Sequence, residues 1–491
     1  MAMRLTELMV TAGLDPATVR DDADVTDVTA DSRRCRAGSC FVAIRGTEAD
    51  GHRYIGAAVA AGAVAVICED PAAAPAGCAW ATVKDGRAAV ARLAQAIRGW
   101  PARRLACIGI TGTNGKTTVA HLVRAILADA GHSPALLGTI AYETGDRALP
   151  AATTTPDPVT LAGLMAEMVA AGRTHLVMEA SSHALDQRRT EGIDFHVAVF
   201  TNLSGDHLDY HHTMGEYRAA KLRLFEALGP GATAAINRDD EAGEALARAT
   251  PAHVRWYGLS SAADLWARIN VIDSTGTDFT LVSAGGETPA HTPLIGRHNV
   301  MNCLAAASAA DALGVTMPAV AESLRRIECI PGRLQRVPSD APFDVFVDYA
   351  HTDDALANVL GALRPVTRGR VIVVFGCGGD RDRTKRPRMA HVAEHMADQV
   401  VVTSDNPRTE RPEEIIEEIC SGFSPAGFDR ASVEPDRRAA IARGVGQARA
   451  GDVVLIAGKG HETYQVFGTE RIHFDDVEVA SEALAALRER S

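Results

Sequence analysis

The sequence lacks the features of a secreted, membrane or disulfide-bonded protein. Its nine cysteines are scattered singly without a C-x-x-C pair, which favours reduced thiols in a cytosol over a disulfide framework or a zinc site. The longest apolar stretch, residues 56–68, is alanine-rich and shorter than the roughly 20 residues that span a bilayer. The chain does not begin with a basic region followed by an apolar one, so no signal peptide is expected. We therefore expect a cytoplasmic protein without a membrane partner.

Positive charge is not concentrated anywhere either. The net charge is −12 and no basic run dominates, which argues against nucleic acid as the main partner. Apolar residues make up 46% of the chain and charged residues 23%, as in ordinary globular proteins. A length of 491 residues predicts about three domains. A dinucleotide-binding motif at residues 376–381 fails because Arg381 stands where the last glycine is needed, so NAD(P) is not expected.

A glycine loop lies between a predicted strand and a predicted helix. The apolar residues 105–110 precede it, and a helical pattern follows it as far as Gly131. In this context, glycines let backbone N–H groups close on phosphate oxygens at the positive end of a helix. The usual pattern has glycine where this chain has Ile110, and the alternative is a plain glycine turn. The candidate phosphate loop contains Gly112, Thr113, Asn114, Gly115, Lys116, Thr117 and Thr118.

Glu179 stands at the end of a second predicted strand, residues 176–178. Open α/β sheets bind ligands at the carboxyl ends of their strands. A carboxylate there, opposite the Thr117 hydroxyl, suits a Mg²⁺ ion that is shared with phosphates, while Lys116 reaches the outer phosphates. The alternative is a solvated glutamate at a strand end.

A third predicted strand, residues 197–200, leads into a loop with several histidines and aspartates. His207 and His211 are four residues apart, but the loop does not assure them one helical face, and a zinc site needs three or four defined ligands. Lys221 follows on a predicted helix, where its spacing alone predicts a surface residue. Farther along, Asn299 is either a helix N-cap or a ligand contact, and Arg333 is either a hinge residue or a phosphate contact.

The last third of the chain is a further series of strands and helices. Predicted strands at 370–375, 400–404 and 453–457 are each followed by polar residues. Because strand ends of this kind meet at one edge of a sheet, we expect these residues to gather there. A cluster of both charges suits a zwitterionic, amino-acid-like ligand, although each residue alone is consistent with a structural role. The cluster contains Arg381, Asp405, Asn406, Arg408 and Glu462.

Together these motifs resemble the ATP-dependent Mur ligases of bacterial cell-wall synthesis, in the expected order and over nearly the whole chain. The resemblance rests on the phosphate loop, residues 178–183, 202–207, Lys221, Asn299, Arg333 and 348–351. Residues 31–33, 46–51, 405–408 and 458–462 resemble the members that add the third amino acid. In that group Asp-Asn-Pro-Arg, here residues 405–408, marks the form that adds meso-diaminopimelate rather than L-lysine. Ile110 is usual in this family.

The resemblance implies an α/β protein of three domains. Residues 1–103 would form a smaller N-terminal α/β domain for the UDP end of the substrate. Residues 104–333 would form a central P-loop ATPase-like domain with a parallel sheet. Residues 334–491 would form a Rossmann-like domain for the amino acid. We expect a monomer.

The resemblance also implies a catalytic set with two Mg²⁺ ions. Thr117 and Glu179 would hold one ion, and His207 would share the second with Lys221 as a carbamate formed with CO₂. A carbamate is an anionic oxygen ligand, which Mg²⁺ prefers to an ammonium group. Lys116 completes the catalytic set. The remaining implied ATP contacts are Asn299, Arg333 and Asp348.

Two further sites are implied for the other substrates. Diaminopimelate would contact Arg381, Asp405, Asn406, Pro407, Arg408, Gly458 and Glu462. UDP-MurNAc-L-Ala-D-Glu would contact Ala30, Ser32, Thr47, Glu48, Ala49, Thr153, Thr154, Thr155, Ser181, Gln187 and Arg189.

The implied reaction is amide formation through an acyl phosphate. ATP would phosphorylate the D-glutamyl γ-carboxylate, and the amine of meso-diaminopimelate would then displace phosphate. The alternatives within the family are the L-lysine-adding form, the ligase that adds D-Ala-D-Ala, and folylpolyglutamate synthetase. Outside it, the alternatives are a P-loop ATPase that switches a partner and an inactive nucleotide-binding protein.

Overall fold

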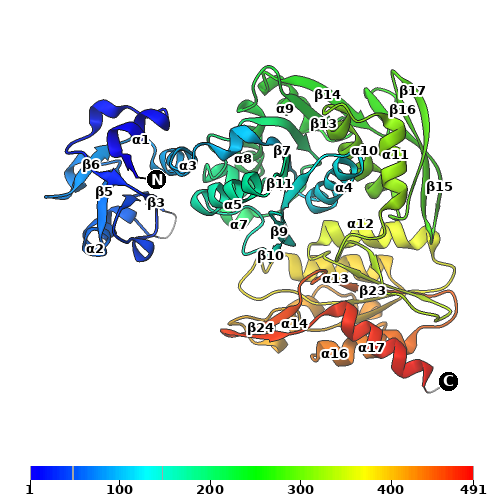
Figure 1. Ribbon diagram of the computed structural model, residues 1–491. Helices are drawn as coiled ribbons and strands as arrows, with labels where there is room; N and C mark the ends of the chain where they lie inside the picture. The colour runs from blue at the N-terminus through cyan, green and yellow to red at the C-terminus, as the bar shows by residue number, and fades with distance from the viewer. Residues whose placement is uncertain (1, 47–48, 146, 490–491) are drawn as a thin grey trace.

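The computed structural model describes residues 2–46, 49–145 and 147–489. They form three α/β domains: an N-terminal domain at the left of Figure 1, a central domain, and a C-terminal domain below it. All nine cysteines are free thiols, as predicted. Within the described ranges, no helix combines the length and apolar character that a membrane crossing requires.

The N-terminal domain is a four-stranded parallel sheet in the order β3-β4-β5-β6. Helices α1 and α3 pack on one face around Leu8 and Leu93, and α2 packs on the other around Ile55. Strands β1 and β2 form a short antiparallel pair. The elements are β1 (Met3–Arg4), α1 (Leu5–Thr11), β2 (Asp24–Val25), β3 (Asp27–Thr29), β4 (Ser39–Val42), α2 (Ile55–Ala60), β5 (Ala63–Cys68), β6 (Ala79–Thr82) and α3 (Gly86–Ala96).

Helix α3 joins the N-terminal domain to the central domain by packing against α5 (Pro158–Ala170), beside which it lies in Figure 1. Apolar side chains of both helices belong to one buried cluster. Two ion pairs cross the same junction: Arg92 with Glu191 at 2.9 Å, and Arg188 with Asp85 at 2.8 Å. The junction therefore combines a small apolar core with paired charges.

The central domain contains an eleven-stranded sheet in the order β10-β9-β8-β11-β7-β12-β13-β14-β15-β16-β17. The run from β8 to β15 in this order is parallel, as predicted, but antiparallel strands extend both ends. The predicted strand–helix alternation gave no sign of these hairpins. The strands are β7 (Ala106–Thr111), β8 (Pro134–Leu137), β9 (Ala141–Glu143), β10 (Ala148–Pro150), β11 (His175–Glu179), β12 (Phe195–Phe200), β13 (Thr233–Asn237), β14 (His253–Gly258), β15 (Leu265–Asp273), β16 (Gly276–Ser283) and β17 (Gly286–Thr292).

Helices cover both faces of this sheet. Apolar residues of α4, α10 and α11 form the core on one face, and those of α5, α8 and α9 form it on the other. The phosphate loop leads from the central strand β7 into α4, so it starts from the rigid middle of the domain. The helices not yet bounded are α4 (Lys116–Asp129), α6 (Ser182–Asp186), α7 (Leu208–His211), α8 (Met214–Glu226), α9 (Gly243–Ala249), α10 (Arg297–Asp311) and α11 (Met317–Arg326).

The C-terminal domain is a six-stranded sheet in the order β18-β19-β23-β20-β21-β22, parallel except for β18. Helices α12, α13 and α14 pack on one face, and α16 and α17 on the other. Strands β24 and β25 form a separate hairpin. The elements are β18 (Gln335–Arg336), β19 (Asp344–Asp348), α12 (Asp353–Leu363), β20 (Val371–Phe375), α13 (Lys385–Met396), β21 (Gln399–Val402), α14 (Pro412–Cys420), α15 (Pro425–Phe428), β22 (Ala431–Val433), α16 (Arg437–Gln447), β23 (Val453–Ala457), β24 (Tyr464–Phe467), β25 (Glu470–His473) and α17 (Asp476–Arg488).

Candidate active site

The phosphate loop is packed closely against neighbouring chain at two glycines. Gly112 has φ 147° and Gly115 has φ 85°, conformations that side chains rarely adopt. A Cβ atom at Gly112 would overlap the Thr201 hydroxyl, and one at Gly115 would overlap Oδ1 of Asn302. Only glycine therefore fits at these positions, and the loop is held at the N-terminus of α4, where phosphate binding is favoured.

Two lysine side chains converge on one carbonyl of this loop. Lys116 Nζ donates to the carbonyl oxygens of Gly112 at 2.9 Å and Thr113 at 2.8 Å. Lys221 Nζ donates to the same Gly112 oxygen at 2.8 Å and lies 4.3 Å from the centroid of the Tyr217 ring. Spacing alone predicts a surface position for Lys221, and this is wrong: its residue is 1% exposed, because α8 packs this face against the loop.

Burial, and then the neighbouring charge of Lys116, lower the pKa of the Lys221 amine well below its usual range. Burial also lowers the pKa of Lys116. A lowered pKa favours the neutral amine at Lys221, and the neutral amine is the form that adds to CO₂. Burial of Lys221 is therefore compatible with the carbamate, which stays a prediction.

Glu179 is buried at the end of β11 and already accepts several hydrogen bonds. Its Oε2 accepts from the Thr117 hydroxyl at 3.0 Å and from the Thr139 hydroxyl at 3.1 Å, and its Oε1 accepts from the Thr139 N–H at 2.8 Å. Arg333 Nη2 donates to Thr117 Oγ1 at 2.9 Å. Glu179 is therefore a fixed buried group opposite the loop and not a solvated strand end.

The oxygen donors at Thr117 and Glu179 fit Mg²⁺, which prefers hard oxygen ligands. The Arg333 guanidinium already places a cation at the Thr117 hydroxyl. His207 and Lys221 line the same cavity, but a lysine amine offers no oxygen, so they fit Mg²⁺ only with the carbamate in place. In the described parts of the chain, no group of three or more His, Cys, Asp or Glu side chains is arranged to hold a metal. Only two of the candidate ligands, Glu179 and His207, belong to these residue types.

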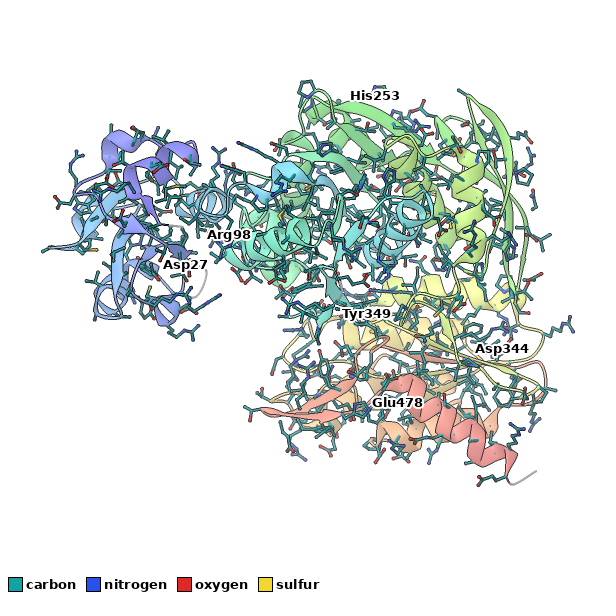
Figure 2. The ribbon with its side chains drawn as sticks, viewed as in Figure 1. Asp27, Arg98, His253, Asp344, Tyr349 and Glu478 are labelled. Atoms are coloured by element: carbon teal, nitrogen blue, oxygen red, sulfur yellow. The ribbon has the colours of Figure 1, made fainter. Side chains whose placement is uncertain are left out.

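The predicted catalytic residues line one cavity of about 160 Å³ between the central and C-terminal domains. Tyr349 of the C-terminal domain lies at this junction in Figure 2. The Arg333 guanidinium lies 4.8 Å from the centroid of its ring. His207 Nε2 lies 3.5 Å from Asp206 Oδ2. The predicted residues at this cavity are Thr113, Asn114, Gly115, Lys116, Thr117, Thr154, Glu179, Ser181, His207, Lys221, Arg333 and Asp348.

A second cavity of about 340 Å³ adjoins the loop and is lined by Asn299, Arg333 and Asp348 as well as Asn114, Gly115 and Thr118. Asn299 does not cap α10: the N-cap is Gly296, and the Asn299 amide donates to the Ile295 carbonyl at 2.9 Å from inside the first turn. Burial raises the pKa of Asp348. Its carboxylate accepts from the Leu334 N–H at 2.6 Å, which ties β19 to the turn after Arg333.

Residues from three strand ends of the C-terminal domain meet in a third cavity, of about 440 Å³. Its lining includes the predicted Arg381, Asp405, Asn406, Arg408, Gly458 and Glu462. Pro407 is not at the surface of this cavity; it belongs to the turn that packs on Gly379. The cavity also shares Asp206, His207 and His351 with the cavity of the phosphate loop, so the two adjoin.

The residues predicted to hold the UDP-linked substrate do not form one group. Ala30, Gln187 and Arg189 line a cavity of about 340 Å³ between the N-terminal and central domains. Thr155 is buried, and its hydroxyl donates to the Glu179 carbonyl at 2.7 Å; Thr153 bonds to the Thr155 carbonyl at 2.9 Å. Ser32 and Ala49 line none of these cavities. Thr47 and Glu48 lie outside the described residues.

Several residues of the site were not predicted. Asp354 at the start of α12 accepts from the Asn114 amide at 2.8 Å and the Ser204 hydroxyl at 2.9 Å, which links the C-terminal domain to the loop. Lys385 and His351 line the third cavity, and Lys459 lies behind it. His351 belongs to the segment 348–351 on which the resemblance rests, but no role at the site was predicted for it. No sequence signal marks Asp354.

Comparisons with known proteins identify the family of the chain. Three family models match the chain in order: the Mur ligase family catalytic domain over residues 24–98, the Mur ligase middle domain over 110–310, and the Mur ligase glutamate ligase domain over 332–460. Two similar proteins are named UDP-N-acetylmuramoyl-L-alanyl-D-glutamate--2,6-diaminopimelate ligase. The one from Geobacter sulfurreducens is 45% identical over 97% of both chains. The one from Gloeobacter violaceus is 45% identical over 100% of this chain and 99% of its own.

Solved structures show the same relationship. A structure titled with the same ligase name has a TM-score of 0.70 and 34% sequence identity, and the match covers 99% of this chain and 100% of that one. The ADP complex of the MurF ligase from Thermotoga maritima has a TM-score of 0.62 at 18% identity, with 95% of this chain and 99% of that one covered, and shares the fold. Together, the ordered matches of three family models and the near full-length relatives show that the chain belongs to the Mur ligase family.

Proposed function

We propose that this chain uses ATP to join meso-2,6-diaminopimelate to the D-glutamyl γ-carboxylate of UDP-N-acetylmuramoyl-L-alanyl-D-glutamate. The observation that carries the proposal is the contact between two cavities. One is lined by the phosphate loop, and the other by arginines and carboxylates of the C-terminal domain, among them Arg381, Arg408 and Glu462. They share Asp206, His207 and His351. An activated carboxylate formed in the first would therefore be within reach of an amine bound in the second.

A carboxylate needs activation because oxide is a very poor leaving group. In the proposed reaction the γ-carboxylate attacks the γ-phosphorus of ATP, the bond to ADP breaks, and an acyl phosphate forms. The amine then attacks the acyl carbon, and inorganic phosphate leaves as the amide forms. Both steps depend mainly on positioning and on stabilisation of charge. The closely packed loop around Gly112 and Gly115 provides the fixed frame for both steps.

Lys116 is the side chain that would move to the outer phosphates. In the structure its ammonium is held by the carbonyls of Gly112 and Thr113 within the loop itself. If the Lys116 ammonium moved to a phosphate oxygen, it would leave two neutral carbonyl acceptors for a charged acceptor. A charged acceptor makes a stronger hydrogen bond. The same exchange would leave the Gly112 carbonyl to Lys221 alone.

Magnesium belongs to this proposal. The Thr117 hydroxyl and Glu179 carboxylate would hold one ion, and His207 with the Lys221 carbamate would hold the other. When bound, Mg²⁺ neutralises charge on the transferring phosphoryl group. Binding at Thr117 would require Arg333 to leave this hydroxyl, and its guanidinium would then be free to contact a phosphate.

The C-terminal cavity suits an amino acid with two carboxylates and two amines. Arg381 and Arg408 make no ion pair within the described residues, and guanidinium binds carboxylate in a bidentate fork. Their side chains donate hydrogen bonds to backbone carbonyls, from Arg408 to Gly379 at 2.7 Å and from Arg381 to Asp380 at 3.2 Å. Asp405 and Glu462 offer carboxylates for the ammonium that does not react. L-lysine has the second amine but lacks the second carboxylate.

The rate of phosphate release from ATP tests the proposal. With the UDP-linked dipeptide present, meso-diaminopimelate should stimulate release strongly and L-lysine only weakly. Equal stimulation by lysine would contradict the specificity and favour the lysine-adding form. ATP turnover without the dipeptide would favour a different kind of ATPase. Cytoplasmic location and a monomeric state remain predictions, which fractionation and light scattering would test.

A further inference from the structure

Lys459 is a fully buried lysine behind the amino-acid cavity. It lies in the turn after β23, between the predicted ligand residues Gly458 and Glu462, and is 0% exposed. Lysine is rare in this chain, with five residues among 50 basic side chains. Most basic positions of the chain are arginine, but this one is lysine. Its compact ammonium is a point charge, whereas an arginine guanidinium is larger and planar.

The Lys459 ammonium connects residues from two strand ends. Its Nζ lies 3.2 Å from Glu462 Oε2, 3.3 Å from Asn406 Oδ1 and 3.7 Å from Asp405 Oδ1. The Asn406 amide in turn donates to the same Glu462 Oε2 at 2.8 Å. Together with the Val466 N–H, which donates to Asn406 Oδ1 at 3.1 Å, these contacts orient the Asn406 amide. They also hold Glu462 against the loop of residues 405–408.

One acceptor of this cluster is left without a hydrogen bond. Asp405 belongs to the cavity lining and is 6% exposed, and its buried Oδ1 has no hydrogen-bond partner among the described residues. A buried carboxylate oxygen without a donor is costly, and a ligand donor would satisfy it. The Lys459 ammonium, 3.7 Å away, attracts this oxygen electrostatically but is too far for a hydrogen bond.

The charges of the cluster favour one added cation. Among the directly contacting groups, Asp405 and Glu462 carry two negative charges and Lys459 one positive charge. The Arg437 guanidinium behind them is already paired with Asp476. A single ligand ammonium would neutralise the remaining negative charge, while Arg381 and Arg408 receive carboxylates. Without Lys459, the buried Asp405 and the half-buried Glu462 would repel each other. The Asn406 amide oxygen would keep only the Val466 N–H, at 3.1 Å, of its two donors.

We propose that Lys459 is a positioning residue for amino-acid specificity. It holds Asn406 and Glu462 in place and leaves the free oxygen of Asp405 to receive the distal ammonium of a diamino dicarboxylic acid. Lys459 does not touch the ligand itself. The inference rests on the proposed function, because it assigns how the same cavity recognises its amino acid.

The test compares Lys459→Met with the wild type in phosphate release, with the three substrates varied in turn. We expect the KM for meso-diaminopimelate to rise about tenfold or more, while the KM values for ATP and the UDP-linked dipeptide change less than about twofold. The preference for diaminopimelate over L-lysine should fall by a similar factor. Lys84→Met, at an exposed lysine of the N-terminal domain, is the matched control and should behave as the wild type.

The double variant Lys459→Met/Glu462→Gln separates positioning from general damage. If the Lys459 ammonium acts through Glu462, removing the charge of Glu462 as well removes the repulsion between Glu462 and Asp405. The rise in the KM for meso-diaminopimelate in the double variant is then smaller than the product of the two single rises. Independent effects would overturn the inference, as would an unchanged KM in Lys459→Met or an equal rise for all three substrates.

Lys459→Gln guards against a variant that fails to fold, because it keeps N–H donors without the charge. Full retention of the wild-type KM in this variant would also overturn the proposed role of the charge, whereas a raised KM in the folded variant supports it. A wild type that shows no diaminopimelate-dependent release would instead refute the proposed function, so the two failures can be told apart.

Discussion

The phosphate-loop cavity and the amino-acid cavity differ in how their charges are satisfied. At the loop, Lys116 and Lys221 share the Gly112 carbonyl, and Arg333 bonds to Thr117 beside a Glu179 that already accepts several hydrogen bonds. In the amino-acid cavity, Arg381 and Arg408 bond to backbone carbonyls and have no ionic partner among the described residues. Asp405 there keeps an oxygen for which the described part of the chain offers no donor.

This difference indicates how each site meets its ligand. The loop is assembled before binding, and its side chains must exchange protein partners for phosphate and metal. The amino-acid cavity leaves charges of both signs open, so the ligand itself supplies the missing partners. Substitutions at the loop should therefore affect turnover, whereas those in the amino-acid cavity should affect the affinity for one substrate.

The largest expected effect is at Lys116. Lys116→Met should lower kcat by about 10³-fold, because the loop would lose the side chain that stabilises charge on the transferring phosphoryl group. Steady-state phosphate release measures it. A loss smaller than tenfold would mean that the loop's backbone alone accounts for the catalysis, and it would break the contrast between the two cavities.

The next effect sharpens the role of the buried amine. Lys221→Ala should lower kcat by about 10²-fold or more, because no carbamate can form. A small added carboxylate such as acetate should restore part of the activity by supplying the anionic oxygen. The rescue should be absent in Lys116→Met, which serves as the control. Full activity of Lys221→Ala without acetate would remove the carbamate from the account.

A third prediction concerns the frame of the amino-acid cavity. Arg437 is fully buried, pairs with Asp476 at 2.7 Å, and donates to the carbonyls of Ser404 and Ala457 at the ends of β21 and β23. Arg437→Met should reduce the free energy of unfolding by about 3–5 kcal/mol, because it leaves the Asp476 carboxylate buried and unpaired. Denaturant unfolding measures the change.

The control for this third prediction is an exposed pair, Arg268 with Glu287, where Arg268→Ala should hardly change stability because the pair is solvated. If Arg437→Met were as stable as the wild type, the buried pair would not hold the strand ends in place. The double variant Arg437→Met/Asp476→Leu should be more stable than Arg437→Met alone.

The smallest effect should be confined to one substrate. Arg408→Met should raise the KM for meso-diaminopimelate about 10- to 100-fold, since a bidentate carboxylate contact is lost, and leave the KM for ATP unchanged. Arg408→Lys should recover part of the affinity by restoring the charge without the fork. A parallel rise in the KM for ATP would show that the two cavities are not separate in function.

The parts of the fold that depend on local sequence were predicted best. The strand, glycine loop and helix around Lys116 lie in one continuous segment, and the three-domain α/β organisation follows from the order of such segments. The antiparallel extensions of the central sheet were missed, because residues 265–292 form hairpins within a chain that otherwise alternates strands and helices.

The parts of the site that depend on packing could not be predicted from spacing. Lys221 is spaced like a surface residue, and only the packing of α8 against the loop buries it. Asp354 reaches Asn114 across a domain boundary, which no local pattern reveals. Arg381, Asp405 and Glu462 were predicted to lie together, because each follows a strand and the carboxyl ends of the strands meet at one edge of the sheet. All three line one cavity.

Transfer of an isotope label tests most directly whether the loop activates a carboxylate. The D-glutamyl γ-carboxylate of the UDP-linked dipeptide would be labelled with ¹⁸O, and the phosphate released during amide formation would be analysed by mass spectrometry. An acyl phosphate leaves one carboxylate oxygen on the phosphate, so we expect the released phosphate to carry a single ¹⁸O. Unlabelled phosphate, with amide still formed, would contradict the account.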